Sequence, residues 1–560
     1  MQEYRFTVKY RVDGILYQTH KERCVHYTID KQVSEDSIRL TINPKVDMQM
    51  LEVSLDTPHV SPDGEAFFGN GFQAWTTSRE YRKDDKFKAT VSPLRHIAKL
   101  ADDWMCCSGD YRFYNPPKGK GHFHSYTYTY YKVDNKLSFY GSLNEQSGYT
   151  RFVADMQGGN FCIQKDIEGK ILKAGEPTLI LDIFVANGSY DEVFDAYFAK
   201  LGVPKPRIDH LSGYTSWYNY FTKISEEIIV RDLEGLGRAG DTANIFQIDD
   251  GYEITVGDWL TLKPEFPNGM KYLADKIHEK GYLAGLWLAP FNCTPRSQMY
   301  KDHKDWVLKI DGKPVRGTPA WGGAYVFDMY NEEYRAYIKE VFRTVFEDWG
   351  FDMVKLDFLY SQAMFPRNGK TRAEIMTDAV LFLRELVGDK LFLGCGVPHG
   401  IGFGVYDACR IGCDVAKIYA GDFTNRLNLT AELPSAQNSI LNAIFRRHLN
   451  GRAFINDPDV FFLRDFNLKF TMDQKLLLGF INHLCGDVLF VSDDVGKYDD
   501  EALLYVKKFF QKCNYKVISA DFVSENDIQI VFETDADPKE VKTLKFNLKT
   551  GVSNIREILA

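Results

Sequence analysis

Aspartates recur at the ends of short apolar segments in the middle and later parts of the sequence. They are Asp249, Asp250, Asp357, Asp414, Asp457, Asp459, Asp493 and Asp494. Carboxylates gathered at strand ends can bind metal ions, or they can supply the acid and the nucleophile of glycoside hydrolysis. A single such aspartate could equally well cap the helix that follows it. So many at equivalent positions favour a shared functional site.

Two of these aspartates have charged neighbours at the spacing of a strand. Lys355 and Asp357 are two residues apart, so both side chains point to one face of the strand. A cation there would keep the carboxylate ionised, as a nucleophile requires, although the two could also form a structural ion pair. Arg410 and Asp414 flank Gly412 on another predicted strand, and the small glycine leaves room between the two charges for a substrate.

Polar and aromatic side chains extend the predicted pocket. Gln247 and Asp249 share one face of their strand, and Asp250 lies beyond them in the turn. Trp287 lies near the end of the next strand, where it could stack on the apolar face of a sugar or simply pack in the core. These residues predict a polar pocket with an aromatic wall.

The segments that carry these residues alternate between short apolar strands and helices. Eight strands are predicted at Tyr214–Tyr218, Ile245–Asp249, Tyr282–Ala289, Met353–Phe358, Leu391–Cys395, Ala408–Asp414, Ala453–Asp457 and Val488–Ser492. Patterns of helical period lie between them, for example over residues 270–277 and 334–345. Such alternation indicates a (β/α)₈ TIM barrel, with active-site groups at the C-terminal ends of its strands. An open doubly wound sheet would also alternate, but no glycine-rich phosphate turn follows any strand.

The regions on either side of the barrel have different patterns. Residues 1–187 alternate at period two between turns, which predicts an N-terminal β-sandwich. Residues 188–210 are predicted as a helical linker that ends in a stiff Val203–Pro206 connector. The catalytic barrel is assigned to residues 211–500 and a small C-terminal β-domain to residues 501–560. The predicted fold class is therefore multidomain α/β and β.

Composition and charge exclude several classes of function. The chain has 560 residues, a net charge of −9 and no lysine- or arginine-rich run, so we expect no nucleic-acid partner. Its longest apolar runs are much shorter than a membrane span, so we expect no membrane association. Charges interrupt the N-terminal segment where a secretory signal would be apolar, and the 10 cysteines contain no Cys-x-x-Cys pair. These features predict a cytoplasmic protein.

A metal-dependent hydrolase is an alternative that the residues themselves suggest. His122 and His124 form the His-x-His pattern that such enzymes place on the first strand of a barrel. Here the pattern lies in the predicted sandwich, well before the barrel, and the chain has only 12 histidines. We therefore expect two solvated strand histidines, and neither a metal nor another cofactor.

Several segments together resemble the family 36 glycoside hydrolases, which are chiefly α-galactosidases. The resemblance spans nearly the whole chain, in the family's order. The matching segments are Asn70–Trp75 (NGFQAW), Ser216–Phe221 (SWYNYF), Phe246–Tyr252 (FQIDDGY), Gly257–Trp259 (GDW), Phe266–Met270 (FPNGM), Gly285–Phe291 (GLWLAPF), Val354–Tyr360 (VKLDFLY), Leu393–Gly396 (LGCG), Arg410–Asp414 (RIGCD), Asn456–Asp459 (NDPD) and Ser492–Asp494 (SDD).

This resemblance implies a retaining, double-displacement mechanism. Asp357 matches the nucleophile that forms a covalent glycosyl-enzyme, and Asp414 matches the acid/base. Asp249 and Asp250 match the pair that holds O4 and O6 of the sugar, the region where galactose differs from glucose. Further matches to substrate-binding or pocket-lining positions are Trp75, Trp287, Lys355, Cys395, Gly396 and Arg410. The implied substrates are α-galactoside oligosaccharides or glycoconjugates.

One charge is at odds with these implied roles. Arg410 should depress the pKa of Asp414, whereas a general acid needs a raised pKa. The residues alone therefore do not assign the acid and the nucleophile, and it is the resemblance that does so. Burial or a shared substrate hydroxyl would reconcile the charge. A retaining mechanism also predicts a separation of about 5–5.5 Å between the two carboxyl groups.

The sequence departs from the family pattern in places, and alternatives follow. Phe72 and Ala74 stand where many relatives have Trp and Ser, and residues 415–419 lack a Trp often found after the acid/base. The leaving-group side of the pocket and the oligomeric state are therefore open, although family members are often homo-oligomers. The nearest alternative is an α-N-acetylgalactosaminidase with the same catalytic pair and more room at C2. A non-catalytic sugar-binding protein is disfavoured because Asp357 and Asp414 are both present.

Overall fold

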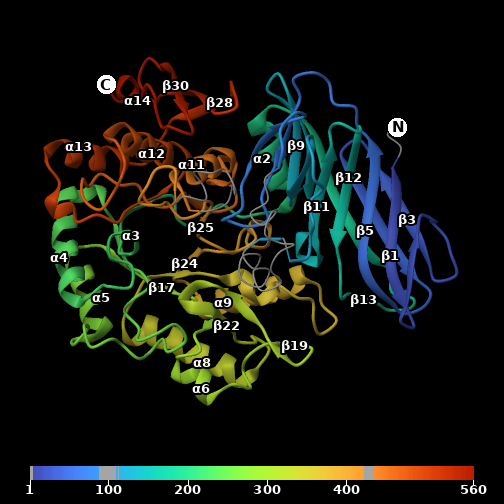
Figure 1. Cartoon of the computed structure of the whole chain (residues 1–560), viewed down its shortest axis with the longest axis horizontal. Coiled ribbons are helices and arrows are strands. Elements are labelled where there is room, and N and C mark those ends of the chain that lie inside the picture. The colour runs from blue at the N-terminus through green and yellow to red at the C-terminus, as the bar shows by residue number, and fades with distance from the viewer. Residues whose placement is uncertain (1–3, 88–108, 111, 422–433) are drawn as a thin grey trace.

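The computed structural model describes residues 4–87, 109, 110, 112–421 and 434–560. Its main sheets are two antiparallel sheets in the N-terminal region, a parallel eight-stranded sheet in the middle and a small antiparallel sheet near the C-terminus. Figure 1 shows the first two sheets, in blue and teal, standing beside the barrel, with the red C-terminal strands at one end of the molecule. The predicted barrel with flanking β-structure is confirmed.

The N-terminal region is a β-sandwich of two seven-stranded sheets. The strand orders are β2-β1-β5-β12-β11-β8, with β13 beside β5, and β3-β4-β14-β10-β9-β6-β7. Period-two burial explains the packing, since Ile38, Leu40 and Ile42 of β4 all point into the core. The bounds are β1 (Arg5–Val12), β2 (Ile15–Thr19), β3 (Tyr27–Val33), β4 (Ser37–Pro44), β5 (Met48–Pro58), β6 (Ala66–Gly69), β7 (Arg79–Arg82), β8 (His122–Tyr126), β9 (Tyr128–Val133), β10 (Lys136–Ser142), β11 (Tyr149–Asp155), β12 (Asn160–Asp166), β13 (Ile171–Leu172) and β14 (Thr178–Gly188).

One helix, α2 (Tyr190–Leu201), connects the sandwich to the barrel. Ser189 and Glu192 form a capping box at its start, and Gly202 ends it in the left-handed conformation with φ 69°. Phe194 and Tyr197 are fully buried, as the helical spacing of apolar residues predicts. The exact domain boundaries stay a prediction.

Eight parallel strands form the barrel, in the order β26-β25-β24-β23-β17-β16-β15-β27. Asp487 N donates to Asn456 O at 3.2 Å and brings the two end strands together, so the barrel is nearly closed. All eight predicted strands are present, but the first lies three residues earlier and the sixth ends at Arg410, four residues early. The bounds are β15 (Leu211–Thr215), β16 (Ile245–Ile248), β17 (Leu283–Leu288), β23 (Met353–Leu356), β24 (Leu391–Gly394), β25 (Ala408–Arg410), β26 (Ile455–Asp457) and β27 (Val488–Val491).

Helices cover the outside of the barrel. Most of them begin at a side-chain cap, for example Thr371 with Glu374 at α9 and Thr471 with Gln474 at α12. The bounds are α3 (Trp217–Tyr220), α4 (Glu226–Leu236), α5 (Gly269–Glu279), α8 (Glu332–Arg343), α9 (Arg372–Val387), α11 (Ala436–Phe445), α12 (Met472–Cys485) and α13 (Asp500–Phe509).

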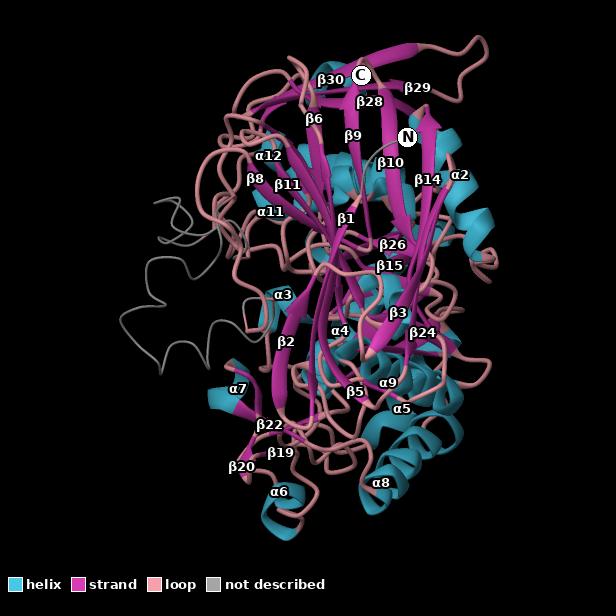
Figure 2. Ribbon diagram, turned by 90° about the vertical axis from the view of Figure 1, so that its right-hand side faces the viewer, coloured by secondary structure: helices cyan, strands magenta, loops and turns pink. Residues whose placement is uncertain are grey.

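A long excursion separates β17 from α8, and a separate sheet follows the barrel. The excursion contains α6 (Gln298–Asp302), α7 (Ala320–Gly323), β18 (Asn292–Cys293), β19 (Lys309–Ile310), β20 (Lys313–Pro314), β21 (Arg316–Thr318) and β22 (Ala324–Val326). The C-terminal sheet consists of β28 (Lys516–Phe522), β29 (Asp527–Glu533) and β30 (Val541–Asn547), followed by α14 (Ile555–Leu559). Figure 2 shows this sheet above strands β6, β9 and β10 of the sandwich.

The sandwich and the C-terminal sheet make ion pairs with their neighbours. Arg372, at the start of α9, pairs with Asp166 at 3.0 Å and with Glu168 at 2.6 Å on the sandwich. Lys132 of β9 pairs with Asp521 of β28 at 2.8 Å. Among the described helices, none combines the length and the apolar character needed to cross a membrane.

Candidate active site

The predicted site residues of the barrel gather at the C-terminal ends of its strands. Lys355 lies in β23, and Asp357 is the first residue after that strand. Asp249 and Asp250 directly follow β16. Trp287 lies near the end of β17. The remaining barrel residues, Cys395, Gly396 and Arg410, lie at the ends of β24 and β25. They therefore meet at the C-terminal end of the barrel strands, as predicted.

Asp357 is held by hydrogen bonds to both of its carboxylate oxygens. The backbone N–H of Phe358 donates to Oδ1 at 2.8 Å, and the indole N–H of Trp287 donates to Oδ2 at 3.2 Å. Burial raises the pKa of Asp357, whereas the charge of Lys355 and hydrogen bonds from Cys395 and Trp287 act to lower it. Trp287 is thus a direct partner of the carboxylate, beyond its predicted part as a wall of the pocket.

Lys355 pairs with Asp249 rather than with Asp357. Its Nζ lies 2.9 Å from Asp249 Oδ2, and both side chains are buried. Gln247 Nε2 donates to the same oxygen at 2.8 Å, and the backbone N–H of Asp250 donates to Oδ1 at 2.9 Å. The alternative reading, a structural ion pair between Lys355 and Asp357, is therefore not the pairing that Lys355 forms. The shared face is correct, because the charge of Lys355 still acts on Asp357 from this position.

Two residues around Asp250 were missed by the sequence reasoning. Trp321 Nε1 donates to Asp250 Oδ2 at 2.8 Å, and the Trp321 ring lies 4.8 Å from that of Phe358. Glu253 is buried beside Asp250, and burial together with the Asp250 charge raises the pKa of Glu253 well above its usual range. Glu253 stands in the same short segment as Asp250, which was a usable signal. Trp321 comes from the irregular excursion after β17, where periodicity carries no information.

Asp414 lies in a loop beyond the end of β25, and not on the strand. Arg410 Nη1 contacts Asp414 Oδ1 at 3.0 Å, and the Asp414 side chain is 43% exposed. The expectation that Gly412 opens a space between Arg410 and Asp414 is therefore wrong, because the strand ends at Arg410 and the loop folds the two groups together. Burial is the main cause of the raised pKa of Asp357, and the charge of Asp414 raises it further, so Asp414 lies within electrostatic reach of Asp357.

Arg410 is shared among three carboxylates. Besides Asp414 it contacts Asp457 Oδ2 through Nε at 3.2 Å and Asp459 Oδ1 through Nη2 at 2.8 Å. Asp459 also accepts a hydrogen bond from the hydroxyl of Tyr218 and one from the backbone N–H of Val415 at 2.8 Å. This cluster joins the ends of β25 and β26 to the loop that carries Asp414.

Cys395 and Gly396 lie directly against Asp357. Cys395 is buried, and burial raises the pKa of its thiol well above the usual value. Gly396 has φ 56°, and a Cβ there would lie 3.0 Å from Phe358 N and 3.2 Å from Asp357 Oδ1. A side chain at Gly396 would therefore meet both a strained backbone and the carboxylate.

Trp75 reaches the barrel from the β6–β7 loop of the sandwich, as predicted. Its ring lies 5.0 Å from Phe358 and 5.7 Å from Tyr360, and its buried indole N–H has no partner among the described residues. The fully buried Arg446 holds the loop by donating to Ala74 O at 2.7 Å and to Gln73 O at 3.0 Å.

The His-x-His pattern lies outside this site. His122 and His124 are on β8 of the sandwich, and they contact Asp155 at 3.6 Å and Asp110 at 3.1 Å. His124 is buried rather than solvated, which corrects the expectation for that residue. No group of three or more His, Cys, Asp or Glu side chains suited to a metal ion occurs in the described part of the chain.

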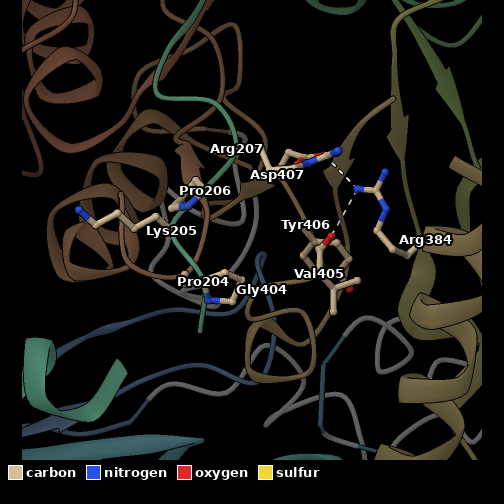
Figure 3. Close-up of a pocket in the computed structure, with 10 residues that line it drawn as sticks. Pro204, Lys205, Pro206, Arg207, Arg384, Gly404, Val405, Tyr406 and Asp407 are labelled. Carbon is tan, nitrogen blue, oxygen red and sulfur yellow. Dashed lines mark hydrogen bonds and ion pairs between the residues drawn. The ribbon is translucent and has the colours of Figure 1, made fainter. Parts of the chain in front are cut away.

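A cavity of about 370 Å³ lies away from this site, near the starts of β15 and β25. Figure 3 shows Arg207 and Arg384 on its wall with both guanidinium groups directed toward Asp407. Arg207 also donates to Lys390 O at 3.0 Å and Arg384 to the same oxygen at 2.7 Å. These hydrogen bonds and ion pairs hold the linker against the barrel, so the charged groups on the cavity wall are already engaged in structural contacts.

Comparison with known proteins finds a family model and relatives that are similar to part of this chain. Residues 240–383 match the Melibiase family model. The chain is 31% identical over 157 residues to α-galactosidase Mel36A of Lactobacillus acidophilus, which is 26% of this chain and 20% of that protein. It is 33% identical over 145 residues to the A type blood α-D-galactosamine galactosaminidase of Flavonifractor plautii, which is 24% of this chain and 13% of that protein. These alignments span a fifth or less of the relatives' length.

Solved structures are similar over nearly the whole chain. The α-galactosidase TtGalA of Thermus thermophilus in complex with stachyose has a TM-score of 0.68 at 25% identity, over 90% of this chain and 99% of that one. The family 36 α-galactosidase AgaA of Geobacillus stearothermophilus has a TM-score of 0.59 at 13% identity, over 97% of this chain and 78% of that one. At that identity the likeness to AgaA shows the fold alone. The predicted resemblance to the family 36 glycoside hydrolases is confirmed.

Proposed function

We propose that this chain, a family 36 glycoside hydrolase with a Melibiase domain, removes terminal α-D-galactosyl residues from α-galactosides. Relatives and structural neighbours bear the name α-galactosidase, and one neighbour is described in complex with stachyose. The observation that carries the proposal is the placement of Asp357. It is a buried carboxylate held by two N–H donors at the barrel mouth, within electrostatic reach of the more exposed Asp414.

In the proposed reaction Asp357 attacks the anomeric carbon and Asp414 protonates the departing oxygen. The covalent galactosyl-enzyme is then hydrolysed by water that Asp414 deprotonates, which makes the reaction retaining. The charge of Lys355 and the donors Phe358 N–H and Trp287 Nε1 favour the ionised Asp357 against its burial. The half-exposed position of Asp414 suits a group that exchanges its proton with a leaving group and with water.

The proposed sugar pocket uses the carboxylates of Asp249 and Asp250 as acceptors for O4 and O6. Both side chains are buried and preoriented, Asp249 by Lys355 and Asp250 by Trp321. A buried acceptor left without a hydroxyl donor is costly, so this pair disfavours a sugar that places O4 elsewhere. The indole N–H of Trp75 has no hydrogen-bond partner among the described residues. In the proposed complex it donates to an oxygen of the substrate from the sandwich side.

A second candidate is α-N-acetylgalactosaminidase activity with the same catalytic pair. The observation that favours it is the relative from Flavonifractor plautii, which carries the name galactosaminidase and is 33% identical over the matched region. Rates on nitrophenyl α-galactoside and on its 2-acetamido analogue distinguish the two activities. A preference for the acetamido substrate would replace galactose by N-acetylgalactosamine in the proposal.

The variant Asp357→Ala tests the nucleophile. We expect its hydrolysis of nitrophenyl α-galactoside to fall by about 10⁴-fold, because no covalent intermediate can form. Azide fits the space left by the carboxylate and attacks the same carbon, so it should restore turnover and give β-galactosyl azide. The measurement is the rate with and without azide, together with NMR of the azide product.

The matched control is Asp414→Ala on the same activated substrate. Here the nucleophile remains, and azide intercepts the galactosyl-enzyme in place of water, so the product should be α-galactosyl azide. Full activity of Asp357→Ala, or the same azide anomer from both variants, contradicts the proposed roles.

A further inference from the structure

Arg410 presents a physical problem for the proposed acid/base. A guanidinium 3.0 Å from Asp414 should keep that carboxyl ionised, yet the reaction needs Asp414 to carry a proton when substrate binds. Neither burial nor distance removes the problem, because Asp414 is 43% exposed and in direct contact with the cation. The solution must lie in the other partners of Arg410.

Those partners are two buried carboxylates. Arg410, Asp457 and Asp459 are each at most 3% exposed, and the two aspartates contact the guanidinium at 3.2 Å and 2.8 Å. Together with Asp414, three carboxylates therefore face one cation. Charges screened so little by water act strongly on one another, so the guanidinium is already neutralised by its buried partners before Asp414 is counted.

The backbone around Asp459 is built to keep this arrangement. Asp459 has φ 76°, an uncommon value for a residue other than glycine, and its N–H donates to Asp457 Oδ1 at 2.9 Å. The Oδ2 atom of Asp459 accepts hydrogen bonds from the backbone N–H of Val415, next to Asp414, and from the hydroxyl of Tyr218. Burial and the charges of Asp414 and Asp457 raise the pKa of Asp459 to about 7, against the opposite effect of Arg410. The cluster therefore already has an excess of negative charge.

Among the described residues, the charged and titratable groups near Asp414 come from several elements. They are Arg410 from β25, Tyr218 from α3, Asp457 at the end of β26, Asp459 just after β26, Asp357 after β23, Cys395 after β24 and Cys413 in the same loop as Asp414. Arg410 is the cation among them in direct contact with Asp414. All the acidic groups favour a protonated Asp414, so the balance depends on how completely the buried pair neutralises Arg410.

We propose that Asp457 and Asp459 are positioning residues that neutralise Arg410, so that it can orient Asp414 by a hydrogen bond while Asp414 retains its proton. The inference rests on the proposed function, because it explains how Asp414 serves as the acid. Removing either carboxylate releases the charge of Arg410 onto Asp414. A carboxyl group that faces a less neutralised cation gives up its proton more readily, so the enzyme loses its acid at a lower pH.

The test is the pH dependence of kcat/KM for Asp459→Asn with phenyl α-galactoside, whose poor leaving group needs protonation. We expect the alkaline limb to move down by about one pH unit, with about tenfold lower kcat/KM beyond it. With 2,4-dinitrophenyl α-galactoside, which leaves without an acid, the limb should move much less. Asp457→Asn carries the same prediction if Asp459→Asn does not fold.

Asp493→Asn is the matched control, since Asp493 is equally buried in an ion pair with Arg464 but contacts neither Arg410 nor Asp414. It should cost stability without moving the alkaline limb. If Asp459→Asn or Asp457→Asn folds and its alkaline limb stays in place or moves to higher pH, the inference is overturned. Failure of the wild-type protein to hydrolyse either galactoside instead overturns the proposed function, so the two failures are distinguishable.

Discussion

At the scale of the residue, the surroundings of Asp357 depend on register between strands. Trp287 and Lys355 are neighbours across β17 and β23, and this places the indole N–H against the carboxylate that follows β23. The period of two within one strand predicted the shared face of Lys355 and Asp357. It could not predict that Lys355 would pair with Asp249 or that Trp287 would donate to Asp357, because both contacts cross between strands.

Trp287→Phe tests this hydrogen bond. The indole N–H favours the ionised form of Asp357, so its removal raises the pKa of Asp357 further. Because the nucleophile must be ionised, the acidic limb of kcat/KM should move to higher pH. The maximum should fall by about 10-fold, as expected for a lost hydrogen bond to a charged group. An acidic limb that stays in place would show that the Trp287 N–H has no influence on the nucleophile.

At the scale of the element, the β6–β7 loop shows what spacing cannot reveal. The resemblance predicted that Trp75 reaches the barrel from the sandwich, and the structure places it there. The residue that holds the loop, Arg446, comes 371 positions later in the chain (446 − 75) and follows α11. It donates to the backbone carbonyls of Ala74, Gln73 and Thr76 of the loop, and contacts with backbone carbonyls leave no pattern in sequence.

Arg446→Met tests whether the loop depends on this residue. The substitution preserves bulk but leaves buried carbonyl groups without donors, so we expect a loss of about 3 kcal/mol in the free energy of unfolding. The loosened loop should also raise KM more than it lowers kcat, because we propose that Trp75 contributes to substrate binding. Denaturant unfolding and steady-state kinetics measure the two effects, with Arg447→Met as the neighbouring control. Unchanged stability and KM would contradict the assignment.

At the scale of the whole molecule, the barrel was predictable because all eight strands are short, apolar and separated by helices. The errors have local causes. Residues 217–220 are mostly aromatic and fit strand or helix equally well, and they form α3. The strand before Asp414 ends at Arg410, where the chain turns so that Arg410 can contact Asp414 and both buried aspartates. Apart from the Trp75 loop, the contacts between sandwich and barrel described above, such as the ion pairs of Arg372, are long-range and left no sequence signal.

Buried histidines make the stability of the whole molecule depend on pH. Burial lowers the pKa of His399 to about 3 and that of His483 to about 4, from an unfolded value near 6.5. The unfolded chain therefore binds protons below pH 6.5 that the folded chain does not, and stability falls as pH decreases. The expected loss by pH 4 is roughly 3 kcal/mol for each histidine. Urea unfolding between pH 7 and pH 4 measures it.

His399→Gln separates this effect from general acid unfolding. The amide can still donate to Arg410 O, as His399 Nε2 does at 2.9 Å, but it does not titrate. Stability should therefore decline less steeply with acid in the variant than in the wild type. An equal slope in the His399 variant would contradict the prediction.

The central claim is that Asp357 and Asp414 act together on one α-galactoside, as nucleophile and acid/base. Proton NMR of the first-formed sugar during hydrolysis of nitrophenyl α-galactoside tests it most directly. Two displacements at the anomeric carbon predict α-galactose first, followed by slow mutarotation to the β anomer. β-Galactose as the first product, or no release of galactose, would contradict the account.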